Sequence, residues 1–85
     1  MKTPESVLED LRSRMPEDIT ARIERIIGEY SFTWRATKSV NGKKLQISLK
    51  VPLYEISFMR NYDGWVDNEC KKVIDQLNTV AASLE

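Results

Sequence analysis

The side chains in this sequence that could do chemistry are mainly cations. Between Glu29 and Glu55, twenty-five consecutive residues contain no acidic side chain. Ammonium and guanidinium groups donate charge-assisted hydrogen bonds to phosphates and carboxylates. The stretch therefore indicates an anion-binding surface, although lysines on a ribbon also protect its edges from pairing with other chains. The basic residues of the stretch are Arg35, Lys38, Lys43, Lys44 and Lys50. The candidates for binding a phosphate or an acidic partner are Arg35, Lys43, Lys44 and Lys50.

No catalytic constellation accompanies these cations. The chain has no histidine and one cysteine, so Ser-His and Cys-His pairs cannot form and zinc has no ligand set. Three glycines give no phosphate-cradling loop. Asp63, Asp67 and Glu69 cluster near a glycine, but Trp65 stands where a calcium loop needs an oxygen ligand. We expect no enzyme, no cofactor and no metal site.

Length and composition predict one small domain over residues 1–85. Thirteen basic and thirteen acidic residues cancel, so any charge effect is local. The single cysteine, the absence of an Asn-x-Ser/Thr acceptor and the lack of an apolar signal or membrane segment favour a reducing, cytoplasm-like compartment without a membrane partner. The terminal Leu84-Glu85 pair is either native or a purification-tag scar.

The pair Asn41-Gly42 predicts a β-hairpin with a type I′ turn, which requires a positive φ at both positions. Counting outward places Val40 opposite Lys43 and Phe32 opposite Val51. One face then collects the apolar residues Phe32, Trp34, Ala36, Leu45, Ile47, Leu49 and Val51. The opposite face collects Ser31, Thr33, Arg35, Thr37, Lys44, Gln46, Ser48 and Lys50.

The residues before this hairpin predict two helices. Thr3 and Pro4 form a start signal, and Pro16 ends the first helix and can begin a second. The second helix is expected over Pro16 to Ile27, with Gly28 as its C-terminal cap. Its apolar stripe consists of Ile19, Ile23, Ile26 and Ile27.

The segment after Pro52 is ambiguous. Tyr54, Ile56 and Phe58 alternate with polar residues and Met59, which predicts a third strand, but the segment also fits an extension of the second strand past a bulge or a short helix from the proline. Asn61 to Gly64 predicts a turn. A helical stripe then runs to the end and places Cys70 in the core as an unreactive thiol; its members are Val66, Cys70, Val73, Ile74, Leu77, Val80 and Ala81.

These elements predict an α+β fold. We expect two N-terminal helices, an antiparallel hairpin or three-stranded meander, and a long C-terminal helix, with the helices on one face of the sheet. The order resembles that of double-stranded-RNA-binding domains, which run helix, three strands, helix. Such domains contact phosphates from the start of the last helix, where this chain has Asp67 and Glu69 before Lys71 and Lys72. The exposed ribbon face also lacks the aromatic residues on which single-strand binders stack bases.

The segment Met59 to Trp65 contains the side chains that dominate protein interfaces. Its candidate interface residues are Met59, Arg60, Tyr62 and Trp65, although Tyr62 and Trp65 could instead complete a thin core. The favoured function is a non-enzymatic protein-interaction domain, adapter or regulator, with a protein partner. The alternative is a nucleic-acid-binding module that uses the basic sheet face. The partner, the process and the formation of a homo-oligomer stay open.

Overall fold

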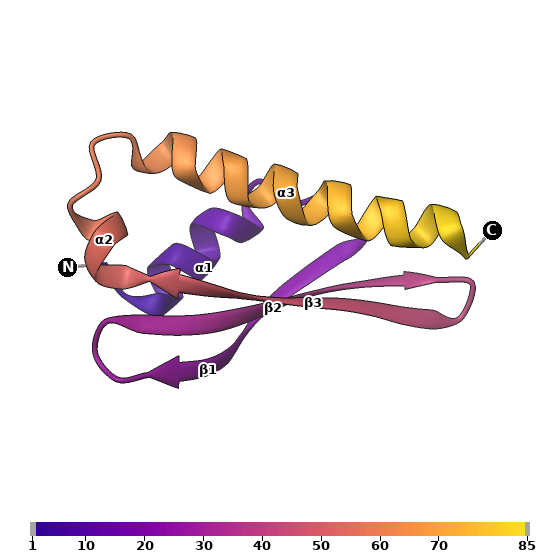
Figure 1. The fold of residues 1–85 in the computed structure, drawn as a ribbon, viewed down its shortest axis with the longest axis horizontal. Helices are drawn as coiled ribbons and strands as arrows, with labels where there is room; N and C mark the ends of the chain where they lie inside the picture. The colour runs from indigo at the N-terminus through magenta and orange to yellow at the C-terminus, as the bar shows by residue number, and fades with distance from the viewer. Residues whose placement is uncertain (1, 85) are drawn as a thin grey trace.

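Three strands and three helices form an α+β fold in this computed structural model, which describes residues 2–84 (Figure 1). The strands form one antiparallel sheet in the order β1-β2-β3. This confirms the α+β class, an N-terminal helix and a long C-terminal helix. Glu85 of the Leu84-Glu85 pair lies outside the described residues. The elements are α1 (Pro4–Arg12), β1 (Ile19–Ile27), β2 (Ser31–Val40), β3 (Lys43–Pro52), α2 (Leu53–Ser57) and α3 (Tyr62–Ser83).

The hairpin of β2 and β3 has the predicted register. Val40 pairs with Lys43 and Phe32 with Val51. Asn41 and Gly42 have φ angles of 52° and 79°, which is the left-handed geometry that a type I′ turn requires at both positions. The turn therefore fixes the register of both strands, and with it the face on which each side chain lies.

The predicted second helix, Pro16 to Ile27, is wrong: Ile19–Ile27 is strand β1. Its isoleucines fit a helical stripe, but Ile19, Ala21 and Ile23 also alternate at the period of a strand, and branched side chains favour strands. Pairing with β2 decides between the two patterns because it satisfies the backbone groups of β1. Gly28, with φ +61°, lies in the turn that joins β1 to β2 rather than at a helix end.

The expected third strand over residues 54–59 is also wrong, and the open alternative of a short helix from the proline is confirmed. Pro52 ends β3 and stands at the N-terminal cap of α2. Proline has no backbone N–H to donate to a continuing ladder. In the helix, Leu53 and Ile56 are spaced three residues apart and both are buried. The meander therefore consists of β1, β2 and β3.

The other two helices begin at side-chain caps. The Thr3 hydroxyl accepts a hydrogen bond from the Ser6 backbone N–H at 3.1 Å, so α1 begins at Pro4. The Asn61 side chain accepts from the Gly64 N–H at 3.0 Å and caps α3. The predicted turn at residues 61–64 is thus the first turn of this helix.

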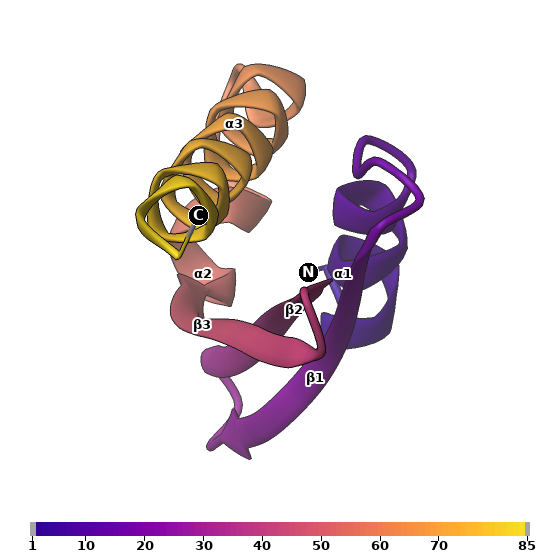
Figure 2. The same ribbon diagram turned by 90° about the vertical axis from the view of Figure 1, so that its right-hand side faces the viewer.

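The hydrophobic core lies between the helices and one face of the sheet. Figure 2 shows α1 and α3 on the same side of the three strands. From the middle strand, Phe32, Trp34 and Ala36 are completely buried. They meet apolar residues from all the other elements, which include Val7, Leu11, Ile19, Val51, Ile56, Val66, Val73 and Leu77. Among residues 2–84, no helix covers the opposite face of the sheet, which we call the open face.

The hairpin turn gives a first prediction. Gly42→Val should lower the free energy of unfolding by about 1 to 2 kcal/mol, because a branched residue is strained at positive φ. Nothing lies within 4 Å of a Cβ added at Gly42, so crowding makes no contribution. Asn41→Gly is the matched control and should change stability by less than about 0.5 kcal/mol, since glycine adopts positive φ freely. Urea unfolding of the three proteins measures both effects, and equal stabilities would contradict the turn geometry.

Candidate functional site

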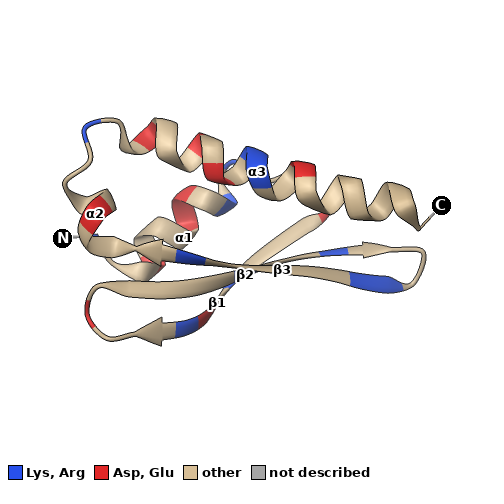
Figure 3. Cartoon of the chain, in the orientation of Figure 1, with Lys and Arg blue, Asp and Glu red and all other residues tan. Residues whose placement is uncertain are grey.

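Charge is segregated between the sheet and the rest of the fold. The three strands carry seven of the thirteen basic residues and one of the thirteen acidic residues, Glu24. Figure 3 shows the acidic residues mainly on the helices and in the loops. A neutral chain therefore has one strongly positive part, which can attract an anionic partner at long range. The basic residues of the strands are Arg22, Arg25, Arg35, Lys38, Lys43, Lys44 and Lys50.

The open face brings together most of the predicted anion-binding residues. Arg35, Lys44 and Lys50 share it, whereas Lys43 pairs with Val40 on the side of the sheet that carries the helices. The pairing of β1 with β2 adds Arg22 and Arg25, which sequence reasoning missed because it assigned them to a helix. A hollow of about 490 Å³ on this face is lined by Asp18, Thr20, Arg22, Arg35, Thr37, Ser39, Lys44 and Gln46.

Glu24 places one carboxylate among these cations. The register between β1 and β2 shifts between Ile23 and Arg25, so Glu24 is the extra residue of a β-bulge. Its carboxylate accepts hydrogen bonds from Arg35 Nε at 2.6 Å and from the Ser48 hydroxyl at 2.9 Å. These bonds, from Ser48 and Arg35, hold the pKa of Glu24 below its usual value. Arg35 is therefore paired within the molecule.

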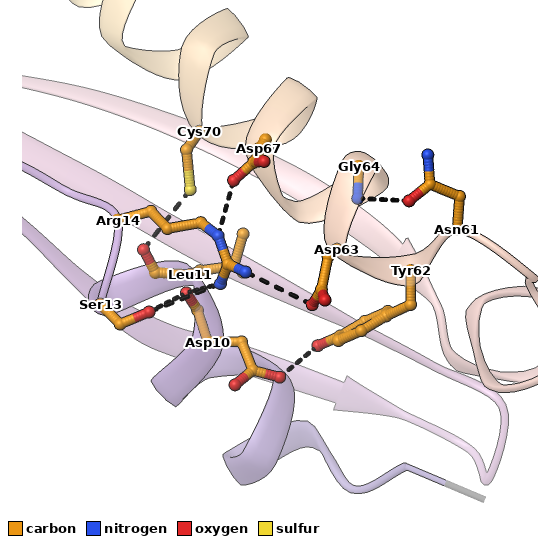
Figure 4. A network of polar contacts seen from close by, with 10 residues as sticks. All are labelled: Asp10, Leu11, Ser13, Arg14, Asn61, Tyr62, Asp63, Gly64, Asp67 and Cys70. Atoms are coloured by element: carbon orange, nitrogen blue, oxygen red, sulfur yellow. Dashed lines mark hydrogen bonds and ion pairs between the residues drawn. The ribbon is translucent and has the colours of Figure 1, made fainter.

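At the start of α3, in contrast to the open face, carboxylates surround a single arginine (Figure 4). Arg14, after the end of α1, donates from Nε to Asp67 at 2.6 Å and from Nη2 to Asp63 at 3.3 Å. The Tyr62 hydroxyl donates to Asp10 at 2.6 Å. Acids at this position also suit the helix dipole. This end of α3 is thus a docking point for α1 and presents carboxylates where a double-stranded-RNA-binding domain presents cations.

The candidate interface residues fall into two groups. Tyr62 and Trp65 are partly buried against the core and stack with ring centroids 6.0 Å apart. The ammonium of Lys2 lies 3.8 Å from the centroid of the Tyr62 ring. Met59 and Arg60 are exposed. The segment therefore contributes two residues to intramolecular packing and leaves two at the surface.

An aromatic cluster that sequence reasoning did not single out lies beside this segment. Tyr30, in the turn between β1 and β2, meets Tyr54 of α2 edge to face at 5.7 Å between ring centroids. Tyr54 also contacts Phe58 at 5.2 Å. All three are more than half exposed, Phe58 by 73%. The four-residue spacing of Tyr54 and Phe58 was the available signal, because it places both on one side of a helix. We call these three residues the aromatic patch.

The single cysteine of the chain lies in the core. Cys70 is buried, its thiol donates to the Leu11 carbonyl oxygen at 3.4 Å, and burial raises its pKa to about 11. Among residues 2–84, no group of three or more potential ligands could hold a metal ion. In the same range, no helix has the length and apolarity to cross a membrane.

Comparison with known proteins gives no further guide: the chain matches no protein-family model, no curated protein and no solved structure.

The Tyr62 hydrogen bond gives a second prediction. Tyr62→Phe should lower the free energy of unfolding at pH 7 by about 1 kcal/mol, because it removes the donor to Asp10 and keeps the ring. Tyr54→Phe is the control and should change stability by less than about 0.3 kcal/mol, since this exposed ring lies outside the core. Thermal and urea unfolding compare the variants; equal effects would show that the bond contributes nothing.

The same tyrosine predicts a pH dependence. Burial and the bond to Asp10 raise the pKa of Tyr62 above its ordinary 10.0. The folded state then holds the proton more tightly, so this contribution is fully present below pH 10 and decreases as the pH rises from 10 towards the folded-state pKa. The stability difference between the wild type and Tyr62→Phe should shrink across that window in a urea series. A constant difference would contradict the raised pKa.

The buried thiol gives a fourth prediction. At pH 7.5, native protein should react with a thiol reagent at least about a hundred times more slowly than protein unfolded in urea, because Cys70 is both buried and protonated. A colorimetric thiol assay measures both rates. Comparable rates would place Cys70 at the surface.

Proposed function

We propose that this chain is a non-enzymatic protein-interaction domain that binds a protein partner through the aromatic patch. The supporting observation is that Tyr30, Tyr54 and Phe58 contact one another in series while each is more than half exposed. Single apolar residues at a surface are common, whereas aromatic rings in contact with one another are typical of binding sites. Tyrosine is also enriched among the residues that dominate binding energies.

The local packing of α2 supports this assignment. Leu53 and Ile56 anchor the helix in the core, so Tyr54 and Phe58 are held on a supported element rather than on a loose loop. Rigid aromatic rings lose little conformational entropy on binding. The exposed Met59 and Arg60 follow directly in the chain and extend the surface with side chains that interfaces favour.

The neighbourhood of the aromatic patch also suits a protein rather than a small molecule. Tyr30 and Tyr54 alone line the shallow hollow there, so it offers no enclosed pocket for a ligand. The end of β1, just before the turn that carries Tyr30, also exposes Ile26 and Ile27, by 55% and 40%. An open, apolar surface with polar residues around it fits the core and rim of a protein interface.

The test compares Tyr54→Ala/Phe58→Ala with Val80→Ala/Leu84→Ala. The control removes two exposed apolar side chains from the other end of the fold, on α3 and just after it. The partner is identified as a protein that the wild type and the control retain at moderate salt from an extract of the native cell. It is then purified, and dissociation constants are measured with each variant.

The patch variant should bind that partner at least about tenfold more weakly than the wild type, since losing a hot-spot residue costs about 2 kcal/mol or more. The control should bind within about twofold. Circular dichroism establishes that all variants fold. Equal affinities of both variants would overturn the proposal.

A further inference from the structure

We infer that the open face is a second binding site, for the phosphate backbone of a nucleic-acid duplex, and that Glu24 is an internal competitor that keeps Arg35 from contacting a phosphate. The inference concerns a different surface from the aromatic patch. It therefore stands or falls independently of the proposed function.

The cations of the open face are arranged in rows across the strands. Lys44 lies opposite Ser39, Arg22 opposite Arg35, and Arg25 opposite Thr33, which pairs in turn with Lys50. From Lys44 to Lys50 the face extends about 20 Å, at about 3.4 Å per residue. A duplex carries one phosphate per 3.4 Å on each strand. One duplex can therefore contact all three basic rows at the same time.

The uncharged residues on and between these rows can also donate hydrogen bonds to phosphate oxygens. Hydroxyl and amide side chains, which donate to phosphate and sugar oxygens in known complexes, lie between the cations. Between Lys44 and Lys50 none of them is apolar, which disfavours a protein partner because the core of a protein interface is apolar. None is aromatic, which disfavours a single strand bound through its bases. They are Thr20, Thr37, Ser39, Gln46 and Ser48; the hydroxyl of Thr33 is buried and takes no part.

Two acidic residues face or border this surface. Asp18 lines the hollow, and its carboxylate lies 3.3 Å from the ammonium of Lys38. Glu24 accepts two hydrogen bonds, from Arg35 and Ser48. A phosphate oxygen can accept hydrogen bonds from the same two donors. In the unbound protein, Arg22, Arg25, Lys44 and Lys50 belong to none of the ion pairs recorded among residues 2–84. These four are the residues available for first contact.

The experiment measures binding of fluorescein-labelled 20-base-pair DNA and RNA duplexes by anisotropy between 50 and 300 mM salt. For the wild type, log K should fall with log salt at a slope of about −3 to −4, as expected for four phosphate contacts. Replacing Arg22, Lys44 and Lys50 with glutamine should weaken binding at least tenfold at 100 mM salt. The matched control replaces Lys43, Arg60 and Lys71, which lie off this face, and should bind within threefold of the wild type.

Glu24→Gln tests the internal competitor. It should bind the duplex at least threefold more tightly than the wild type and steepen the slope by about 0.9, because Arg35 becomes available for one more phosphate. Glu55→Gln makes the same charge change on α2 and should not steepen the slope. Adding Arg35→Gln to Glu24→Gln should abolish the gain, whereas adding Lys43→Gln, which removes the same charge from the other side of the sheet, should keep it; the comparison separates an effect through Arg35 from a general change in charge.

Several outcomes would overturn the inference. Equal binding by the open-face variant and its matched control would show that the contacts lie elsewhere. Tighter binding of a single-stranded 20-mer would contradict a backbone-only site, and binding of poly-glutamate without binding of either duplex would assign the face to an acidic protein. An unchanged slope in Glu24→Gln would remove the competitor role. If both duplexes bind, their relative affinities show which nucleic acid the face prefers.

Discussion

The register of β2 between its two neighbours is the constraint on which the rest of the structure depends. Adjacent side chains of a strand point to opposite faces, so a shift of one residue would exchange the core face and the open face. In the observed register, Phe32, Trp34 and Ala36 are buried beneath the helices, while Thr33 and Arg35 point away from them. The turn at Asn41-Gly42 sets this register on one side of β2, and pairing with β1 sets it on the other.

The same register produces the charge segregation. Because the core face of each strand is mainly apolar, the arginines and lysines of β1 and β3 are mostly displayed on the open face. The helices carry most of their acids on surfaces that face solvent or each other. Arg14 uses two of those acids, Asp63 and Asp67, to join α1 to α3. Ion pairs this exposed contribute little stability, so their effect is mainly to orient one helix against the other.

The two proposed surfaces make different physical demands on the fold. The aromatic patch depends on α2, a short helix that cannot be stable alone and is held by Leu53 and Ile56. The open face depends on the register and spacing of three paired strands. One surface offers apolar area and the other charge, so the first should respond weakly to salt and the second strongly. The two proposed sites share no residue.

The internal pairing of Arg35 shows how a fold can moderate a charged surface. A carboxylate held among cations lowers the field that an approaching anion meets. It also hydrogen-bonds with Arg35 and Ser48, two side chains at the middle of the open face. The bulge at Glu24 makes this possible, since the additional residue redirects a side chain that regular pairing would place differently.

Local sequence determined the elements whose signals lie within a few residues of one another. The hairpin followed from Asn41-Gly42, α1 from Thr3 and Pro4, and the last helix from an apolar stripe that correctly placed Cys70 in the core. Much of the open face also followed from the sequence, because the register set by the turn places Arg35, Lys44 and Lys50 on one face of the hairpin.

Tertiary structure decided what depends on partners distant in the chain. Residues 19–27 fit a helix and a strand equally by their isoleucines, and only the ladder with β2 made them a strand. That ladder added Arg22, Arg25 and Glu24 to the open face, so the sequence could not reveal that Arg35 is paired. The contacts between Tyr62 and Asp10 and between Tyr30 and Tyr54 join residues 52 and 24 positions apart. Such contacts form only when packing brings their elements together, and no local pattern encodes them.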